Sequence, residues 1–527
     1  MELRKLPIGI QSFEDLKKNQ YVYVDKTEYI EKLVNSGKVF FLSRPRRFGK
    51  SLFLSTLEAY FQGKKDLFKG LDIEQYENEK GDDAWKSYPV IKFSLAGGDY
   101  LRENGLEDIL KTTIKSYGSQ YHVKESGETL PVQFGHLIKN ISGQTGKQVV
   151  ILVDEYDKPL LDTMNVNTEQ EEKNRQLYSS FFSVLKDEDA YLKFVFITGV
   201  TKFAKVSIFS GLNQLRDISL SREYAGICGI TQNELNTCFR EEIKNMAEEN
   251  EMSEEECVQE LAELYDGYHF ARKSEGVYNP FSLMNAFQEK EFGRYWFSTG
   301  TPTFLVRALE NSDYTPEVLN DGVAVTEDIL KDYRGDLNDP VPLAYQSGYL
   351  TIQKYERESG LYYLSFPNDE VEYGYLNVLA PSVLGGRETD RVVSIARMNE
   401  DLRNGKIDSF MTRLQSLFAS IPYTETKELK YEEFWQREVY LVLKLLGQRT
   451  YCQPHTARGR ADCVIETKKY VYILEFKMDQ SVEEALKQIE EKGYAFPYKS
   501  DPRTLYKIGV KFSSEKRTIE EWKIAEQ

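Results

Sequence analysis

Residues 40–61 read FFLSRPRRFGKSLFLSTLEAYF, an apolar run followed by a basic loop and then by apolar residues at helical spacing. A strand, a loop and a helix in this order form phosphate-binding loops, because the N–H groups at the start of the helix attract an anion. The common loop pattern is G-x-x-x-x-G-K-[ST]. Gly49, Lys50 and Ser51 match its end, but Arg44 stands where its first glycine is expected. From the loop alone, a nucleotide site and an ordinary surface turn both stay open.

The side chains of this loop suit phosphate chemistry. Lys50 can reach the terminal phosphates, and the Ser51 hydroxyl can hold Mg²⁺. Pro45 can fix one turn of the loop and so replace part of the conformational role of the missing glycine. The residues that add positive charge where phosphates would lie are Arg44, Arg46 and Arg47.

A second stretch, KQVVILVDEYDKP (147–159), places two acids directly after an apolar run. An acid at the carboxyl end of a parallel strand faces the ligand. We expect Asp154 to hold Mg²⁺ and Glu155 to orient and deprotonate the attacking water. A further apolar run ends in Thr198, which can sense the terminal phosphate. The alternatives, a solvated acidic turn and a threonine that merely favours a strand, lose weight once these acids are paired with the loop.

The first 200 residues alternate short apolar runs with amphipathic helical stretches, which predicts a parallel α/β sheet. The expected strands are 39–42, 89–95, 149–153 and 194–198, each a continuous apolar run as in a sheet covered on both faces. From residue 231 the pattern is helical, and Thr231 with Glu234 three residues later predicts a capped helix start.

At 527 residues the chain is too long for one ordinary core. The domains that we expect are 1–230, an ATPase-like core; 231–300, a helical lid; 301–427, a mixed connecting region; and 428–527, a C-terminal α/β domain. The net charge of −16 disfavours a surface that binds nucleic acid throughout. That charge is uneven, because residues 431–527 carry 17 basic and 16 acidic residues and the rest of the chain has a net charge of −17.

Cysteine and histidine usage argues against a zinc site or a disulfide framework. The 5 cysteines form no C-x-x-C pair, and only 4 histidines occur. No run of 18 uncharged apolar residues and no signal-peptide pattern is present. We therefore expect no membrane partner and a cytoplasmic location.

A second chemical site is predicted near the C-terminus, in RGRADCVIETKKYVYILEFKM (458–478). Two strand-like runs flank a short turn and predict a β-hairpin. Glu475 and Lys477 are two residues apart and share a face, and Asp462 opens the partner strand. Asp462 and Glu475 can bind Mg²⁺ or Mn²⁺, while Lys477 positions a water or neutralises charge on a phosphodiester. The alternative is a salt bridge on an edge strand.

Residues on both sides of this hairpin can contribute. Glu433, on a predicted upstream helix, offers a further acid for the metal. Gln488, on a predicted downstream helix, and Tyr494 near its end can contact metal-bound water or backbone phosphate. Arg460, just before the hairpin, is a candidate contact for nucleic acid.

The segments YVDKTEYIEKL (23–33), RPRRFGKS, DEYDKP and YDGYHF…VYNPFSLMNAF (265–287) together resemble the AAA-ATPase-like family of bacterial P-loop ATPases. The resemblance covers most of residues 5–300, and R-P-R-R-F-G-K-S is this family's own form of the loop. It implies a P-loop NTPase sheet with a helical lid, and an ATP site with Lys50 on the phosphates and Asp25 and Lys26 near the adenine. The loop residues implied to bind the cofactor are Arg44, Pro45, Arg46, Arg47, Phe48, Gly49, Lys50 and Ser51.

The order helix with Glu, G-R-x-D, hairpin, E-x-K and helix with Gln resembles the PD-(D/E)xK nuclease superfamily over about 430–500. No arginine finger can be assigned, although Arg216 and Arg222 follow the last core strand. A homo-oligomer stays open for this reason, since a finger in trans needs a neighbouring subunit.

Two functions follow as hypotheses. The first is an ATP-hydrolysing AAA-like ATPase coupled to a metal-dependent nuclease that acts on DNA, with RNA left open. The alternative is a regulatory or sensor ATPase whose C-terminal module binds nucleic acid or a partner protein without cleavage.

Overall fold

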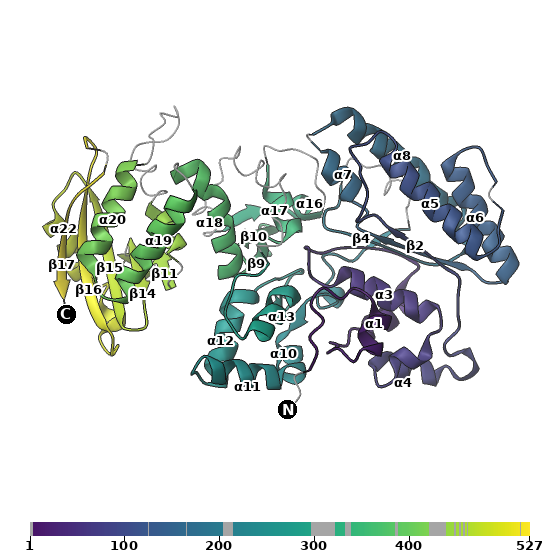
Figure 1. Ribbon diagram of the computed structural model, residues 1–527, viewed down its shortest axis with the longest axis horizontal. Helices are drawn as coiled ribbons and strands as arrows, with labels where there is room; N and C mark the ends of the chain where they lie inside the picture. Colours follow the sequence, from purple (N-terminus) through teal and green to yellow (C-terminus); the bar gives the residue numbers. More distant parts are fainter. Residues whose placement is uncertain are drawn as a thin grey trace. The chain divides into compact units, whose positions relative to one another are not determined.

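The computed structural model describes residues 4–124, 126–164, 166–203, 214–296, 322–331, 339–384, 388–420, 439–446, 449–452, 455–456, 459–460, 462–516 and 518–526. The chain forms two compact units (Figure 1). The N-terminal unit comprises Met1–Ser312 and Asp321–Val371, and the C-terminal unit comprises Asp313–Asn320 and Glu372–Gln527.

A five-stranded sheet of order β2-β3-β4-β1-β5 forms the centre of the N-terminal unit, and all its strands are parallel. The strands are β1 (Val39–Ser43), β2 (Val90–Ser94), β3 (Val149–Asp154), β4 (Leu192–Gly199) and β5 (Arg216–Asp217). The four predicted strands are confirmed. Because β4 lies between β1 and β3, the carboxyl ends of these three strands meet at one edge of the sheet.

Helices cover both faces of this sheet (Figure 1), with α5, α6 and α8 on one side and α1, α3 and α4 on the other. The helices are α1 (Phe13–Lys18), α2 (Glu28–Ser36), α3 (Lys50–Phe61), α4 (Asp72–Glu79), α5 (Gly105–Gln120), α6 (Leu130–Thr145), α7 (Lys158–Thr163) and α8 (Thr168–Asp187). Short 3-10 helices are η1 (Lys65–Phe68), η2 (Gly81–Asp83), η3 (Asp189–Tyr191) and η4 (Arg222–Tyr224).

A helical cluster follows the sheet in the same unit. It comprises α10 (Gln232–Cys238), α11 (Arg240–Glu249), α12 (Glu254–Tyr265), α13 (Pro280–Glu289) and the short strands β6 (Ile230–Thr231) and β7 (Val277–Tyr278). The predicted capping box of Thr231 and Glu234 is confirmed. The helix that it starts is shorter than the pattern suggested, because it ends at Phe239, which is fully buried and stacks on Phe287 at 5.5 Å.

The N-terminal unit also contains a three-stranded antiparallel sheet of order β8-β10-β9. Its elements are β8 (Val323–Val325), α16 (Glu327–Lys331), α17 (Val341–Ser347), β9 (Thr351–Glu356) and β10 (Leu361–Ser365). This part packs close to the phosphate loop, since a Cβ on Gly348 would lie 2.7 Å from Pro45.

A mixed sheet of order β11-β14-β15-β16-β17 forms the centre of the C-terminal unit, and its parallel pair is β15 with β16. The strands are β11 (Arg449–Cys452), β14 (Cys463–Glu466), β15 (Tyr470–Met478), β16 (Thr504–Ser513) and β17 (Thr518–Glu526), with β12 (His455–Thr456) and β13 (Gly459–Arg460) as a separate pair. The helices are α18 (Asp369–Leu384), α19 (Glu388–Arg403), α20 (Ile407–Ser420), α22 (Val482–Lys492) and the 3-10 helix η6 (Phe496–Tyr498).

Helices cover both faces of this second sheet as well. Ile489 of α22 packs into a cluster with Val471 and Ile473 of β15. On the opposite face, the Tyr472 hydroxyl donates to the carbonyl of Leu402 in α19 at 2.6 Å. The predicted hairpin is confirmed as β14 and β15. Over the described ranges of both units, no helix combines the length and the apolar character needed to cross a bilayer.

Candidate nucleotide and metal sites

The loop between β1 and α3 has the backbone of an anion cradle. Arg47 and Gly49 adopt positive φ angles of 69° and 95°. Gly49 is the N-cap of α3 and no side chain caps this helix. Because the first N–H groups of a helix lack partners within the helix, they are available to an anion here.

Lys50 joins this loop to the acids of β3. Its ammonium donates to the backbone carbonyls of Arg44 and Pro45, each at 2.9 Å. The residue is only 8% exposed, and burial lowers the pKa of Lys50, while the nearby carboxylates of Asp154, Asp157 and Glu155 oppose that shift. The structure therefore brings the loop lysine within electrostatic reach of both acids that the sequence singled out.

The carboxyl ends of β3 and β4 present buried oxygens that lack partners. Within the described residues, Asp154 Oδ1, Thr198 Oγ1 and Thr201 Oγ1 are buried without a hydrogen bond. Such atoms are rare, and a bound water, ion or ligand is the usual explanation. A hydrated Mg²⁺ with a phosphate would satisfy them, so this donor set fits an ATP–Mg²⁺ site. Next to Asp154, Glu155 is held at a φ of 52°, which is strained for a side chain of this kind.

Asp157 is a third acid of the DEYD turn, and the sequence did not mark it. It is 2% exposed and accepts from the N–H groups of Val200 at 3.0 Å and Thr201 at 2.7 Å. Burial raises the pKa of Asp157 to about 6. A Cβ on Gly199 would lie 2.4 Å from its carboxylate, so this approach requires glycine. Asp157 thus ties the turn after β3 to the turn after β4.

A cavity of about 450 Å³ opens in front of the loop, a size typical of ligand sites. Its polar side carries the phosphate loop from Arg46 to Ser51, together with Glu155 and Lys158. Its apolar side comes from separate parts of the chain: Pro7, Ile8, Ile10, Leu16, Val22, Val24, Ile227, Ile230, Phe281 and Met284. A charged end and an apolar end in one cavity suit a nucleotide, whose phosphates and base differ in the same way.

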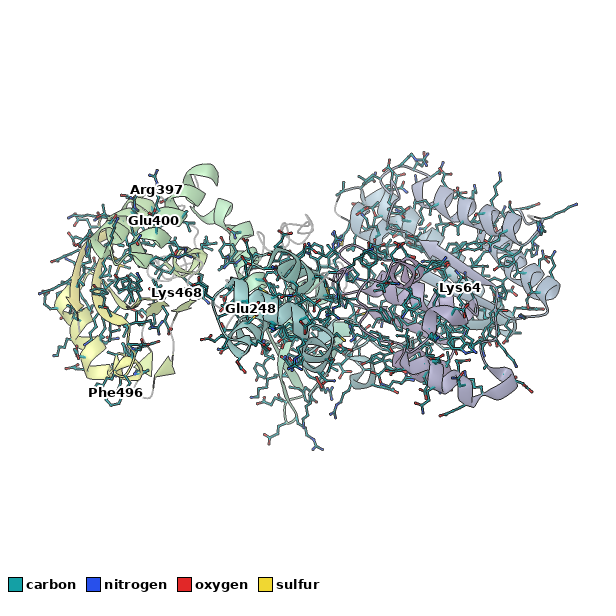
Figure 2. The ribbon with its side chains drawn as sticks, turned by 60° about the horizontal axis from the view of Figure 1, so that its bottom comes forward. Lys64, Glu248, Arg397, Glu400, Lys468 and Phe496 are labelled. Carbon is teal, nitrogen blue, oxygen red and sulfur yellow. The ribbon has the colours of Figure 1, made fainter. Side chains whose placement is uncertain are left out.

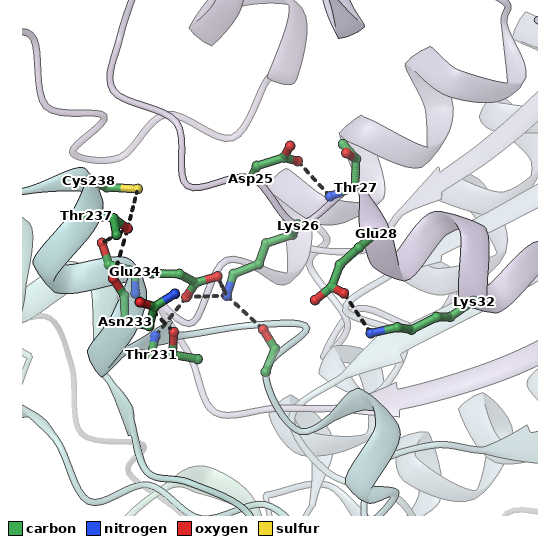
Figure 3. Close-up of polar contacts among 11 residues, drawn as sticks. Asp25, Lys26, Thr27, Glu28, Lys32, Thr231, Asn233, Glu234, Thr237 and Cys238 are labelled. Atoms are coloured by element: carbon green, nitrogen blue, oxygen red, sulfur yellow. Dashed lines mark hydrogen bonds and ion pairs between the residues drawn. The ribbon is translucent and has the colours of Figure 1, made fainter. Parts of the chain in front are cut away.

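The two residues expected near the adenine lie differently (Figure 3). Lys26 lines the cavity, and its ammonium contacts the Glu234 carboxylate at 2.6 and 2.7 Å and the Gly226 carbonyl at 2.8 Å. The Asp25 carboxylate accepts from the N–H groups of Thr27 and Asp72, each at 2.8 Å. Asp25 therefore supports the starts of α2 and α4, and Lys26 is the cavity residue of the two.

The remaining loop residues contact α13 and segments next to the helical cluster. The Arg47 guanidinium lies 4.8 Å from the Phe281 ring centroid, and the Arg46 carbonyl accepts from the Trp296 indole at 3.2 Å. Phe48 packs edge-on against Tyr268 at 4.7 Å. Arg46, Arg47 and Phe48 line the cavity, whereas the Arg44 guanidinium bonds to backbone carbonyls behind the loop.

The predicted acids of the C-terminal site meet across the hairpin. Asp462 precedes β14 and lies opposite Glu475 of β15, since Cys463 pairs with Leu474. The Asp462 N–H donates to Glu475 at 3.3 Å, and the Phe476 N–H donates to the Asp462 carboxylate at 2.8 Å. Burial, and then the charge of Asp462, raise the pKa of Glu475 to about 7. A buried carboxylate on Glu475, whose charge the neighbouring Asp462 disfavours, makes with Asp462 a donor set that suits a divalent cation.

The side chains around these acids also come together. The Lys477 ammonium contacts the Glu475 carboxylate at 3.0 Å. Gln488 of α22 donates to the same carboxylate and contacts the Tyr494 hydroxyl at 3.3 Å. Glycine is required at Gly509, where a Cβ would lie 2.5 Å from the backbone of α22, so this helix lies close to the sheet. The expected neighbours of the acids are thus present.

Other predictions for this site are met only in part. Glu433 lies outside the described residues, and Arg460 belongs to β13, which pairs with β12. Across the described ranges, no group of three or more His, Cys, Asp and Glu side chains is arranged to hold a metal ion. Of the acids predicted for this site, the described residues therefore include two, Asp462 and Glu475.

An exposed aromatic side chain lies close to these residues in the sequence (Figure 2). Phe496 is 65% exposed, and the Lys499 ammonium lies 4.3 Å from its ring centroid. It follows Tyr494 by two residues. An aromatic ring beside a cation is a pair that nucleic-acid-binding surfaces use, through stacking on a base and attraction to phosphate.

Comparison with known proteins finds two domain families in the chain. Residues 7–209 match a family model described as predicted AAA-ATPase, and residues 430–522 match a model of the PD-(D/E)XK nuclease superfamily. The chain is also 35% identical over 541 residues to a protein of Azotobacter chroococcum mcd 1 described as an uncharacterized protein in the vnfD 5' region, with 98% of each chain covered. The chain belongs to the predicted AAA-ATPase family. Its C-terminal domain is of the PD-(D/E)XK nuclease superfamily.

Family membership confirms the resemblance and the fold class expected from the sequence. The AAA-ATPase-like domain contains the phosphate loop and the DEYD turn, and the nuclease-like domain contains the paired acids. The chain therefore combines an ATPase-type domain with a nuclease-type domain. The roles of single residues stay predictions.

Sequence reasoning missed the apolar wall of the cavity and Asp157. The wall comes from segments near residues 8, 228 and 284, which no local pattern links to the loop. Asp157 stood in the DEYD motif, three residues after Asp154, and this was the one available signal.

Proposed function

We propose that the AAA-ATPase-like domain binds ATP with Mg²⁺ in the 450 Å³ cavity and hydrolyses it. The observation that carries this proposal is that Lys50, Ser51 and Glu155 line the polar end of one cavity, with Asp154 close enough to act electrostatically on Lys50. The buried oxygens of Asp154 and Thr198 that lack partners support it further.

Each residue has a distinct task in this proposal. Lys50 leaves the carbonyls that it now contacts and binds the β- and γ-phosphates. Ser51 and Asp154 would hold Mg²⁺, which neutralises charge on the phosphates when bound. Glu155 orients and deprotonates the attacking water, and Thr198 reports on the terminal phosphate.

We propose in addition that the nuclease-like domain cleaves nucleic acid, with DNA as the substrate that we favour and RNA left open. Asp462 and Glu475, with Glu433 as a further acid, would hold Mg²⁺ or Mn²⁺, which activates water and stabilises charge on the phosphodiester. Lys477 positions that water, and Gln488 and Tyr494 orient Glu475. Phe496 and Lys499 support contact with an unpaired base and a phosphate.

The wider setting belongs to the same proposal. Cys228, Cys238 and Cys257 are free thiols, which supports a reducing cytoplasm. The boundaries near residues 230, 300 and 427 are the domain limits that we propose. A homo-oligomer would supply an arginine finger to the ATP site.

Phosphate release by the full-length protein tests the ATPase half. Wild type should hydrolyse ATP with Mg²⁺. Lys50→Ala should lose ATP binding, whereas Glu155→Gln should keep binding and lose hydrolysis by at least about a hundredfold. A wild type without ATP hydrolysis, or hydrolysis unchanged in Lys50→Ala, would contradict the proposal.

A regulatory or sensor ATPase that binds nucleic acid without cleavage is the alternative, and the near-neutral charge of residues 431–527 favours weak binding of this kind. Cleavage of plasmid DNA, single-stranded DNA and RNA with Mg²⁺ or Mn²⁺ separates the two. We expect cleavage that Glu475→Ala abolishes. Salt-sensitive binding without cleavage in wild type would favour the alternative.

A further inference from the structure

Arg44 takes the place of the first glycine of the common loop pattern, and its side chain is almost fully buried, at 1% exposure. One guanidinium nitrogen donates to the carbonyls of Ser43 and Ser219, each at 2.8 Å, and the other donates to the Tyr224 carbonyl at 3.0 Å. The side chain therefore fastens the end of β1 to the segment that follows β5.

The same guanidinium reaches the helical cluster. It lies 4.1 Å from the ring centroid of Phe270, which belongs to the YDGYHF segment. Phe270 in turn packs edge-on against Phe48 of the phosphate loop at 5.6 Å. Arg44 is thus held between the phosphate loop, the segment after β5 and the segment before β7.

This placement is costly for a cation. Among the described ion pairs, none joins Arg44 to a carboxylate, and its Nε is buried without a hydrogen bond. The carboxylate that acts electrostatically on it, Asp217, pairs with Lys202 at 3.0 Å. Burial lowers the pKa of Arg44. A well-packed apolar residue in such a position is often as stable or more stable, so packing alone does not explain an arginine here.

The backbone of Arg44 connects the side chain to the ATP site. Its carbonyl accepts from the Lys50 ammonium at 2.9 Å, and its N–H donates to the Gly199 carbonyl at 3.2 Å. Gly199 ends β4 and lies against the Asp157 carboxylate. The anchored side chain fixes the peptide that faces Lys50, and it does so from behind the cavity.

We propose, resting on the ATP site proposed above, that Arg44 is a positioning residue for ATP binding. Its guanidinium fork holds the first peptide of the phosphate loop in the conformation that binds phosphate. Arg44 does not adopt a positive φ angle, so its backbone does not need glycine, and three hydrogen bonds and one ring hold this peptide in place. Restoring glycine should therefore weaken ATP binding.

Arg44→Met, Arg44→Lys and Arg44→Gly test this inference in the full-length protein, with ATP Kd from calorimetry, steady-state ATPase kinetics and thermal unfolding. Methionine keeps the length and apolar packing, so the unfolding temperature should stay unchanged or rise. ATP Kd and KM should increase about tenfold or more, because hydrogen bonds to a charged group are lost. At saturating ATP, kcat should stay within about threefold, because Lys50 and Glu155 are intact.

Arg44→Lys retains the charge but has one nitrogen in place of the two separated nitrogens that reach Ser219 and Tyr224, so its ATP Kd should also rise about tenfold. Phe270→Leu keeps the hydrogen bonds and should raise Kd less, by about threefold. A stably folded Arg44→Met with a Kd within twofold of wild type would overturn the inference, as would wild-type affinity in Arg44→Lys.

Arg102→Gly is the matched control, because Arg102 is exposed and pairs with Asp108 on the surface. It should bind ATP as wild type does. If wild type itself binds no ATP, the proposed function fails. If wild type, Arg102→Gly and Arg44→Met bind ATP equally, only the role of Arg44 fails.

Discussion

Single acids in both domains are buried more deeply than isolated carboxylates tolerate, and each has a partner that explains its position. Asp157 accepts two backbone N–H groups, and Glu475 contacts Lys477 and Gln488. Burial still raises the pKa of both acids, to about 6 and about 7. Their protonation near neutral pH is therefore a measurable property at the scale of one residue.

Asp157→Asn should remove part of the pH dependence of the stability of the N-terminal unit. Because the folded-state pKa of Asp157 is raised above the unfolded value of 3.8, its stabilising contribution is complete below that value and is lost as pH rises through about 6. The free energy of unfolding of the variant should equal that of wild type near pH 4. At pH 7.5 it should exceed that of wild type by up to about 3 kcal/mol. Urea unfolding at both pH values measures the difference.

Asp187→Asn is the surface control for this experiment and should show no such trend. If Asp157→Asn raises the free energy of unfolding equally at both pH values, the raised pKa assigned to Asp157 is contradicted.

Glu475→Gln should abolish metal binding by the nuclease-like domain. The raised pKa of Glu475 means that protons compete with the cation, so stabilisation of this domain by Mn²⁺ should grow as pH rises from 6 to 8 in wild type. The variant should show no stabilisation at either pH. Without metal it should be more stable than wild type at pH 8, since the contribution of protonated Glu475 is lost as pH rises through about 7.

Thermal unfolding with and without Mn²⁺ measures these differences, and Glu515→Gln on the surface is the control. Equal stabilisation of wild type at pH 6 and pH 8 would show that Glu475 does not hold the cation.

At the scale of elements, the strands that could be predicted from the sequence are those in which consecutive residues are all buried. Strands β1 to β4 are uninterrupted apolar runs, so their positions and their place in a parallel sheet could be read directly. The two-residue strand β5 carries the polar pair Arg216 and Asp217 and has no such signal.

Contacts between distant elements could not be predicted in this way. Gly348 approaches Pro45, and Asp157 binds the turn after β4, because the tertiary packing brings these segments together. The apolar wall of the nucleotide cavity has the same origin. The candidate acids were found from strand ends, and Lys477, Gln488 and Tyr494 from the order of the C-terminal motif, whereas Asp157 and the apolar wall required the structure.

Gly267→Ala tests how tightly the YDGYHF segment packs against the backbone at Pro367. Gly267 has a φ of 90°, and a Cβ there would lie 2.0 Å from the Pro367 carbonyl oxygen. Both the strained backbone and the clash should destabilise the N-terminal unit by more than about 2 kcal/mol. ATP binding should weaken as well, because Tyr268 packs against Phe48 of the loop.

Gly143→Ala is the control, because a Cβ there meets no atom within 4 Å and the residue lies in α6. It should be neutral or stabilise by up to about 1 kcal/mol. Thermal unfolding compares the two variants. A Gly267→Ala variant as stable as wild type would contradict the tight packing at this position.

At the scale of the whole molecule, one chain carries an ATPase-type domain and a nuclease-type domain of different charge. Residues 431–527 have a net charge of +1, and the rest of the chain has a net charge of −17. If ATP gates access to the nuclease site, ATP should change the rate of DNA cleavage in wild type and leave it unchanged in Lys50→Ala. A cleavage rate that ATP does not alter in wild type would mean that the two activities are independent.

The central claim is that Lys50 and the acids after β3 bind a magnesium triphosphate in the cavity. A crystal structure of the full-length protein with Mg²⁺ and a non-hydrolysable ATP analogue tests it most directly. We predict that Lys50 leaves the carbonyls of Arg44 and Pro45 for the β- and γ-phosphates, with the metal beside Ser51 and Asp154. An analogue bound elsewhere, or an empty cavity with Lys50 still on those carbonyls at saturating analogue, would contradict the claim.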